Sequence, residues 1–424
     1  MKEFYKKIKN LLHNNKKVVE NYFFMTVLQI LNSFFYLLIY PYLIRVLGKE
    51  SYGMYVFAYG ISMYFVYLVG FGFDMPGTKA IALAPNNKKS MSHTLSCIFT
   101  AKLYLEIIAV ILFVIIIFSI PSLRNQWLLY SFCFLNTLTS ILFPQWYFQG
   151  IQKMRIVTLI QVAFKILSLP AIFLFVKTTT DVFCYALIIS VFNISGAFVS
   201  YYIITKQHKI RIHLVKFNFI KQWYKDATPF FATVAAGTLK SQTIVILIGA
   251  LFTKTDVAYY DLANKIVAIP NTLVTNINGA LFPKAIISLT KEKLKKIIHS
   301  EIYIGLISII ALIIFGKWLV ILFGGNEMLL SYPMVVILSF TILSWLVTGG
   351  YINFFFLPNR FYSYVTKNQF IALISFFVFF FIGIFLYKSV FILPISLSLS
   401  AITEWIYCWL IVKRKYNYNY NYNS

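Results

Sequence analysis

Five lysines interrupt long apolar segments of this 424-residue sequence: Lys102, Lys165, Lys240, Lys265 and Lys317. A lysine at the centre of a bilayer costs about 2.5–3.5 kcal/mol on insertion scales, so a retained one requires a partner or a function. Lys165 and Lys240 lie near the middle of their segments and have no carboxylate three or four residues away. Because cations in a medium of low dielectric constant attract anions strongly, both are candidates for contacting an anionic substrate.

Two further lysines have a carboxylate four residues away. Lys102 precedes Glu106 near one end of its segment, which predicts snorkelling and an intrahelical ion pair. Lys265 follows Asp261, so a structural ion pair is one interpretation of that position. A functional role for Lys265 is an equally good interpretation, because Pro270 lies in the same helix. A proline inside a helix frees carbonyl groups that can line a cavity.

Three carboxyl groups lie in the same apolar segments: Glu106, Asp261 and Glu404. They are candidates for ion coupling or for charge pairing, and Glu404 or Glu106 could reach Lys240 or Lys165 from another helix. Exporters of cationic drugs require intramembrane carboxylates, and lysines could occupy all three here. The surplus of cations over anions therefore indicates an anionic substrate.

Motifs for hydrolysis of ATP, metal binding and catalysis are missing from the sequence. It contains no GxxxxGK[ST] phosphate-binding loop, and its five histidines lie in loops or at segment ends. No Ser-His-Asp or Cys-His constellation can be assembled on one side of a membrane. The four cysteines have no paired spacing and are typical of small buried hydrophobic residues. We expect a transporter rather than an enzyme, with no metal and no cofactor.

The elements that position these groups follow from composition. Hydrophobic residues make up 60% of the chain and charged residues 12%, against about 25% charged in a soluble domain. Apolar runs of about 20 residues match helices that cross a hydrocarbon core, and they lack the alternation of barrel strands. We therefore expect an all-α polytopic membrane protein with about twelve transmembrane helices. The expected spans are 21–43, 52–73, 97–119, 127–148, 156–176, 182–204, 227–251, 257–282, 298–322, 329–357, 365–387 and 389–412.

Positive charge is distributed unevenly between the two sides of this predicted bundle. The net charge is +25, and most lysines and arginines outside the spans fall on the side of the N-terminus. The positive-inside rule then predicts that both termini are cytoplasmic. Because the basic residues form short clusters between apolar runs and no folded basic face, we expect no nucleic acid as a partner.

The two halves of the chain repeat at an offset of 205 residues. Lys49 aligns with Lys254, and the string KAI at 79–81 aligns with the same string at 284–286. Both halves begin on the same side, so the repeats are parallel, as in several secondary transporters with a substrate site between the halves. We expect a cytoplasmic amphipathic basic leader at 1–20, six-helix lobes at 21–204 and 227–412, a basic cytoplasmic linker at 205–226 and a cytoplasmic low-complexity tail at 413–424.

Short strings along the chain carry a family resemblance. They are QILN (29–32), PYLIRVLG (41–48), YG (52–53), FGF (71–73), GTKAIA (77–82), PQWYFQG (144–150), AYY (258–260), ANKI (263–266) and LFP (281–283). The string at 144–150 is similar to a P-x-W-x-F-Q-G element. Together they resemble the bacterial O-antigen and polysaccharide flippases, the Wzx-type proteins. Each string also suits a plain structural role, such as an interfacial aromatic belt or a close helix contact at glycine.

The resemblance implies a MATE-like exporter fold, in which two six-helix lobes surround a cavity lined mainly by spans one, two, seven and eight. It implies a flippase of the bacterial inner membrane that moves an undecaprenyl-diphosphate-linked oligosaccharide, such as an O-antigen repeat unit of lipopolysaccharide, to the periplasmic leaflet by alternating access. Lys240 and Lys265 then lead the candidates for binding diphosphate or sugar, and Lys165 follows. The expected partners are this lipid-linked oligosaccharide, the phospholipid bilayer and polysaccharide polymerase machinery.

Two other functions stay open at this point. One is a multidrug exporter of the same fold, and the other is a membrane polysaccharide polymerase or ligase. Such enzymes use a large non-cytoplasmic loop, whereas the loops expected on that side are all short. The first span carries no internal charge, unlike that of some relatives, so the resemblance leaves the diphosphate ligands open.

Overall fold

The structure is a computed structural model that describes residues 16–288, 291–359 and 361–420. These residues form helices and contain no strand. The predicted spans lie in helical regions, although the span at 127–148 is divided into the short helices Trp127–Phe134, Thr137–Leu142 and Gln145–Gly150. Within the described ranges nine segments are long and apolar enough to cross a membrane, or ten with one bent pair. The all-helical membrane architecture is therefore confirmed, and the helices of the described chain are compatible with about twelve passes. Residues 1–15 of the predicted leader, 421–424 of the tail and the side chains of the strings at 281–283 and 284–286 lie outside the description.

Contacts divide the chain into two compact units. Unit 1 comprises residues up to 35 together with 61–234, and unit 2 comprises 36–60 and 235 onward. The chain therefore enters unit 2 for 25 residues early in its course, returns to unit 1, and enters unit 2 again inside a helix. Residues 36–60 are called the hairpin segment below.

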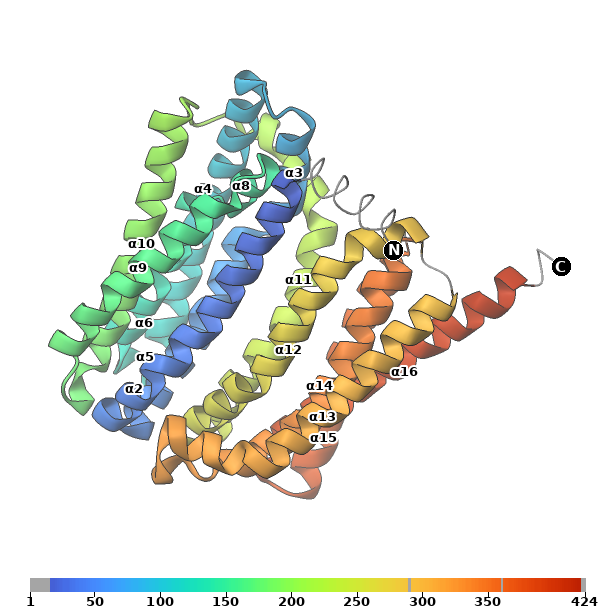
Figure 1. Ribbon diagram of the computed structural model, residues 1–424. Helices are drawn as coiled ribbons and strands as arrows, with labels where there is room; N and C mark the ends of the chain where they lie inside the picture. The colour runs from blue at the N-terminus through green and yellow to red at the C-terminus, as the bar shows by residue number, and fades with distance from the viewer. Residues whose placement is uncertain (1–15, 289–290, 360, 421–424) are drawn as a thin grey trace. The chain divides into compact units, whose positions relative to one another are not determined.

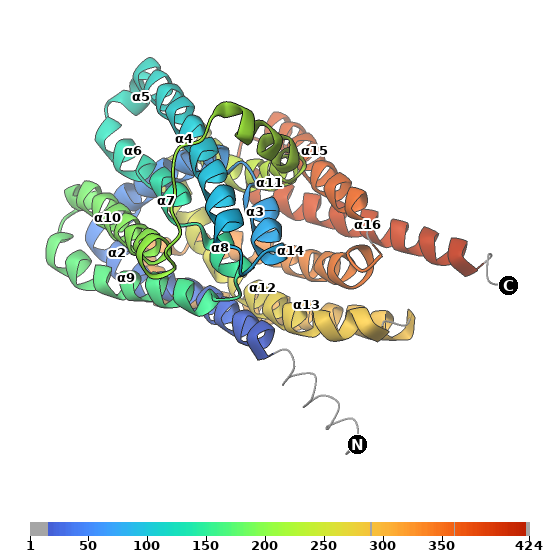
Figure 2. The same ribbon diagram turned by 90° about the horizontal axis from the view of Figure 1, so that it is seen from above.

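Unit 1 shares two long helices, α2 and α11, with unit 2, and both are labelled in Figure 1. Its elements are α2 (Lys16–Gly70, outside the hairpin segment), α3 (Asp74–Leu83), α4 (Lys88–Ser119), α5 (Pro121–Arg124), α6 (Trp127–Phe134), α7 (Thr137–Leu142), α8 (Gln145–Gly150), α9 (Met154–Phe175), η1 (Thr179–Asp181), α10 (Val182–Tyr202), η2 (Ile203–Gln207) and the first half of α11 (Phe217–Leu251). Helices α9 and α10 lie side by side, as Figures 1 and 2 both show.

Polar side chains cap the start of two helices of unit 1. The Asn87 side chain caps α4 by accepting a hydrogen bond from the backbone N–H of Ser90. Thr178 and Asp181 form a reciprocal capping box at the start of η1, directly before α10. Such caps satisfy the backbone N–H groups that a helix leaves unpaired in its first turn.

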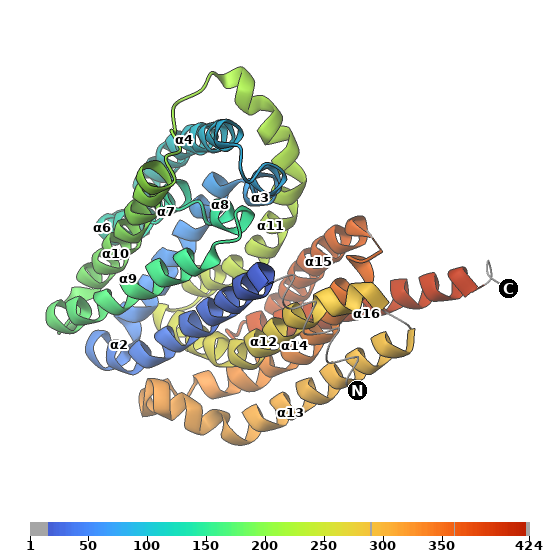
Figure 3. The same ribbon diagram turned by 45° about the horizontal axis from the view of Figure 1, so that its top comes forward.

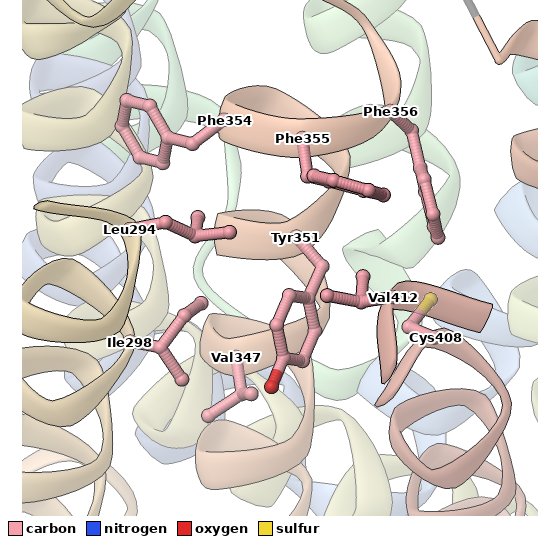
Figure 4. Packing of buried hydrophobic residues seen from close by; sticks show 9 residues of the cluster. All are labelled: Leu294, Ile298, Val347, Tyr351, Phe354, Phe355, Phe356, Cys408 and Val412. Atoms are coloured by element: carbon pink, nitrogen blue, oxygen red, sulfur yellow. The ribbon is translucent and has the colours of Figure 1, made fainter. Parts of the chain in front are cut away.

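Unit 2 contains the hairpin segment, the second half of α11 and the remaining helices. Those helices are α12 (Lys254–Ser288), α13 (Lys291–Gly324), η3 (Asn326–Met328), α14 (Ser331–Tyr351), η4 (Ile352–Phe356), α15 (Tyr362–Leu386) and α16 (Ile392–Tyr420). Figure 4 shows Leu294 and Ile298 of α13 packed with Val347 and Tyr351 of α14, beside Cys408 of α16. Since lipid is as apolar as these side chains, close van der Waals packing rather than water exclusion associates such helices within the bilayer.

The first two predicted spans are two helices, together labelled α2, that meet directly at a kink where a loop was expected at 44–51. Gly48 lies at the kink with φ 72° and ψ 165°. Side chains other than glycine rarely adopt this backbone conformation, so glycine lets the chain reverse between spans without a separate loop.

An extended segment at 208–216, called the strap below, leads from η2 to α11 and runs beside α4 (Figure 3). Hydroxyl groups spaced four residues apart on α4 bind backbone groups spaced two apart on the strap. The three pairs are Ser92 with Arg211, Ser96 with His213, and Thr100 with Val215. Four helical residues rise about 6 Å and two extended residues about 6.6 Å, so the two spacings match.

His208, the first residue of the strap, contacts Tyr147 of α8. Its Nδ1 lies 2.8 Å from the hydroxyl of Tyr147. Burial lowers the pKa of His208 below its usual value, and Lys153 and Lys88 lower it further because they repel a second positive charge. The imidazole is therefore neutral at pH 7, and the surroundings of the strap are basic.

Helix α3 packs closely against α8, and Gly77 makes this approach feasible. A Cβ atom at Gly77 would lie 2.7 Å from the Trp146 ring, closer than real Cβ atoms come. At Gly70 a Cβ atom would meet nothing within 4 Å.

We expect Gly77→Ala to lower the thermal unfolding midpoint of the purified protein, because overpacking costs about 1–3 kcal/mol. This cost outweighs the gain of up to about 1 kcal/mol in helix propensity from glycine to alanine. Gly70→Ala is the matched control and should leave the midpoint unchanged or raise it. Equal midpoints for the two variants would show that the α3–α8 approach is not tight.

Candidate functional site

Lys240 of α11 and Glu404 of α16 form a buried ion pair within unit 2, with side chains 10% and 4% exposed. Trp345 of α14 contacts both groups. Its ring centroid lies 5.9 Å from the Lys240 ammonium, and its side chain hydrogen-bonds Glu404. Three helices of unit 2 therefore meet at this pair, through one cation, one carboxylate and one aromatic ring.

The pair changes what Lys240 can do. Removing two charges from water costs several kcal/mol per ion, and only a close, hydrogen-bonded partner recovers that cost in a low-dielectric interior. Lys240 has such a partner, so an incoming anion must compete with the Glu404 carboxylate. Lys240 could bind a substrate anion only after its pairing with Glu404 is broken. Its role in substrate binding stays a prediction.

Lys265 of α12 belongs to a second polar cluster in unit 2. Its ammonium lies 2.6 Å from Asp261 Oδ2 and 2.7 Å from the Tyr52 hydroxyl, which itself donates to Asp261 Oδ2 at 2.8 Å. The expected pairing of Asp261 with Lys265 is present. Because Tyr52 belongs to the hairpin segment, the cluster connects that segment to α12.

Three tyrosine rings surround the Lys265 ammonium, and we call them the tyrosine cage. Tyr36, Tyr40 and Tyr52 have ring centroids 5.0, 5.2 and 5.4 Å from the nitrogen. Cation–π attraction at this distance is strengthened by desolvation. The site therefore combines one ammonium, one carboxylate, aromatic faces and phenolic hydroxyls.

The hairpin segment approaches α12 closely beside the tyrosine cage. The Tyr40 hydroxyl donates to the backbone oxygen of Ala258 at 3.2 Å. A Cβ atom at Gly53 would overlap the backbone oxygen of Lys254, so only glycine fits this contact. The Lys254 ammonium lies 3.2 Å from the centroid of the Phe57 ring and donates to the backbone oxygen of Gly249 at 2.6 Å. The contacts of Tyr40, Gly53 and Phe57 join the segment to one end of α12, and the hydrogen bond to Gly249 joins that end to α11.

Lys165 of α9 lies in unit 1, away from both clusters along the chain. Its ammonium donates to the side-chain oxygen of Asn32 at 2.6 Å and lies 5.3 Å from the centroid of the Phe35 ring. A neutral amide orients the ammonium without cancelling its charge. Lys165 remains a candidate anion ligand by this contact.

The predicted ion pair between Lys102 and Glu106 is wrong. Lys102 donates to the backbone oxygen of Ser140 at 2.8 Å and lies 3.6 Å from Asp74 Oδ1. The carbonyl of Ser140 would ordinarily accept from residue 144, but Pro144 has no N–H. Lys102 occupies the acceptor that this proline leaves open.

The carboxylate of Glu106 contacts Thr137 and no lysine in the described chain. Its Oε1 accepts a hydrogen bond from Thr137 Oγ1 at 2.6 Å. Its Oε2 is buried and has no hydrogen-bond partner among the residues that the structure describes. Glu106 is therefore the candidate ion-coupling carboxyl without a lysine partner in the described chain.

Sequence reasoning missed the aromatic and amide partners of the lysines. Asn32 and Tyr52 lie within strings that carry the family resemblance, so a signal for both existed. Tyr36, Tyr40 and Trp345 had no such distinction in a chain with 19% aromatic residues. The part of the chain that the structure describes contains no group of three histidine, cysteine, aspartate or glutamate residues arranged to hold a metal ion.

Comparison with known proteins identifies a matching family and two relatives that share one name. Residues 18–288 match the family described as "Polysaccharide biosynthesis protein". A protein of Escherichia coli (strain K12) named "Putative O-antigen transporter" is 26% identical over 319 residues, 75% of this chain and 76% of that protein. A protein of Shigella dysenteriae with the same name is 25% identical over 258 residues, 60% of this chain and 63% of that protein.

Solved structures show the same fold in more distant proteins. The lipid II flippase MurJ, in an inward closed conformation, superposes with a TM-score of 0.70 at 14% identity, covering 93% of this chain and 87% of its own. An inward-facing multidrug resistance MATE family transporter of the MOP superfamily gives 0.65 at 12% identity, covering 90% and 94%. The expected MATE-like fold is confirmed.

We expect the Lys240–Glu404 pair to show strong coupling in unfolding measurements. Lys240→Met and Glu404→Gln each remove one partner, and breaking a buried pair costs about 3–5 kcal/mol. The double variant Lys240→Met/Glu404→Gln should lose much less than the sum of the two single losses, because it leaves no buried charge. Lys317→Met, at an exposed lysine of α13, is the control and should have little effect. Additive losses in the double variant would argue against the pair.

Proposed function

The chain belongs to the family of polysaccharide biosynthesis proteins, and from this premise we propose that it is a flippase for a lipid-linked oligosaccharide. It is a multi-pass membrane transporter of polysaccharide, not an enzyme, with the fold of MurJ and the MATE transporters. The cargo we propose is an undecaprenyl-diphosphate-linked repeat unit of the O-antigen type. It moves from the cytoplasmic to the periplasmic leaflet of the inner membrane by alternating access, with both termini of the protein cytoplasmic.

The tyrosine cage around Lys265 is the observation that carries this proposal. An ammonium and phenolic hydroxyls can bind phosphate oxygens, and aromatic faces suit the apolar faces of sugar rings. These groups lie within a membrane protein, where unneeded polar groups are costly. A diphosphate-linked sugar presents the matching charge and shape.

Substrate binding at Lys265 would also loosen the hairpin segment. A diphosphate that takes the ammonium from Asp261 and Tyr52 removes hydrogen bonds that hold this segment to α12. A ligand shifts a conformational equilibrium by its differential affinity for the two states. The substrate's charge is thus the trigger we propose for release of the segment.

The driving force can come from the membrane potential. A diphosphate diester carries about two negative charges, and moving each outward across an inside-negative potential releases about 2.3 kcal/mol per 100 mV. Proton or sodium antiport is equally open, through Glu106, Asp261 or Glu404. Glu106, with one buried oxygen lacking a partner in the described chain, is the group to examine first. Polysaccharide polymerase machinery is the proposed partner that receives the exported unit.

A multidrug exporter is the second candidate, favoured by the likeness to a MATE transporter. Cationic drugs need intramembrane carboxylates. Lysine ammonium groups already pair with Asp261 and Glu404, so of the three candidate carboxyls only Glu106 lacks a lysine partner in the described chain. We therefore favour an anionic cargo.

Complementation of a deletion strain tests the cargo-binding role. At matched expression, we expect Lys265→Ala to reduce surface polysaccharide by at least tenfold, and Lys240→Ala and Lys165→Ala to reduce it severalfold. Lys317→Ala should restore the wild-type amount. Full surface polysaccharide from Lys240→Ala, Lys265→Ala and their double variant would refute the lysine hypothesis. Drug sensitivity of the deletion strain with intact surface glycan would identify a multidrug exporter.

Release of the hairpin segment has its own test. Tyr52→Phe keeps the ring but removes the hydroxyl that joins Asp261 and Lys265, a net loss of about 0.5–1.5 kcal/mol per hydrogen bond. We expect a cysteine introduced at Ala258, in a background without the native cysteines, to react severalfold faster with a maleimide. Tyr332→Phe removes a comparable hydroxyl contact to a backbone oxygen on α13 and serves as control. Unchanged labelling in Tyr52→Phe would mean that this hydroxyl does not hold the segment.

A further inference from the structure

A cavity of about 750 Å³ lies beside the strap in unit 1. Its lining includes Ser92 of α4, Thr205 and Lys206 of η2, and Arg211 and His213 of the strap. Neither the proposed cargo site nor the hairpin segment shares any of these residues. The cavity therefore has no role in the function described so far.

The chemistry of the lining is that of an anion site. The Ser92 hydroxyl donates to the backbone oxygen of Arg211, and the Thr205 hydroxyl donates to that of Tyr201, so both hydroxyl protons are in use. Among the residues that the structure describes, no carboxylate forms an ion pair with Lys206 or Arg211. A guanidinium presents its N–H groups as a planar fork that matches phosphate oxygens.

Backbone hydrogen bonds hold these two cations at a defined place. The backbone oxygen of Arg211 accepts from the Ser92 hydroxyl, which ties the strap to α4. One residue earlier, the backbone N–H of Ile210 donates to the backbone oxygen of Ile204 at 3.1 Å, which ties the strap to η2. Lys206 belongs to the same short helix η2. The two basic side chains therefore project from a backbone that is fixed on both sides of the cavity.

The strap lies where a membrane interface is expected. Exposed apolar side chains on α4 run from Tyr104 to Phe118 and mark its lipid-facing part. The strap binds α4 between Ser92 and Thr100, just outside that apolar run. Helix α4 ends at Ser119, and a hydrocarbon core of about 30 Å takes about 20 helical residues. The core edge therefore falls near Thr100, which places the part of the strap beside Ser92 and Ser96 at the level of the lipid headgroups.

Apolar side chains flank the cations at this level. Leu214 is 69% exposed and Phe217 is 56% exposed. The ring of Phe217 packs against Tyr104, where the lipid-facing part of α4 begins, with centroids 6.1 Å apart. Basic residues beside exposed apolar ones are typical of segments that bind anionic membrane surfaces.

We propose that the cavity beside the strap binds the phosphate of an anionic phospholipid headgroup, held by Lys206 and Arg211. The acyl chains of this lipid lie against Leu214 and Phe217. On the orientation proposed above, the lipid belongs to the cytoplasmic leaflet. The strap connects α10 to α11, so a bound lipid also ties this connection to the membrane surface.

Native mass spectrometry of the full-length protein in neutral detergent tests the site. Phosphatidylglycerol is titrated against the wild type and against Lys206→Gln/Arg211→Gln, with phosphatidylcholine as the zwitterionic comparison. We expect the double variant to bind phosphatidylglycerol at least tenfold more weakly. The wild type and the double variant should bind phosphatidylcholine with the same weak affinity.

Lys221→Gln/Lys225→Gln is the matched control, because it removes two exposed positive charges from α11 outside the cavity. It should retain wild-type affinity for phosphatidylglycerol. Equal weakening by both double variants, or equal binding of the two lipids by the wild type, would overturn the proposal. So would a site that takes sodium phosphate but not phosphatidylglycerol, since the ligand would then be free phosphate. Matching elution in size-exclusion chromatography checks that all variants are folded.

Discussion

Lipid offers no hydrogen bonds, so a polar group inside the bilayer is costly unless it finds a partner within the protein. This constraint explains the contacts of the intramembrane lysines. Lys240 is paired with Glu404, Lys265 with Asp261 and Tyr52, and Lys165 with Asn32. Each partner satisfies an ammonium that would otherwise be costly to insert.

The same constraint makes cargo binding an exchange of partners. A diphosphate that reaches Lys265 replaces contacts already made to a carboxylate and a phenol, so the net gain in free energy is smaller than the attraction itself. A moderate gain suits a transporter, because cargo must also leave. The tyrosine cage then contributes selectivity through shape, which an isolated ammonium lacks.

The sequence predicted most of the spans because hydropathy is a local property, but the span expected at 127–148 is divided into the three short helices α6, α7 and α8. It predicted the Asp261–Lys265 pair from a spacing of four residues on one helix. The same spacing failed for Lys102, because Pro144 exposes a carbonyl on another helix that competes for the ammonium. Partners on distant helices, such as Trp345, leave no periodic signal in a chain so rich in aromatic residues.

The early passage of the chain through unit 2 has a consequence for biogenesis. Tyr52 is hydrogen-bonded to Asp261, which lies 209 residues further along the chain. At a synthesis rate of about 5–20 residues per second, roughly 10–40 s separate the insertion of the two. During that interval the hairpin segment has no α12 to pack against. The nascent protein must therefore keep this segment in a provisional arrangement until translation of α12 supplies its permanent neighbour.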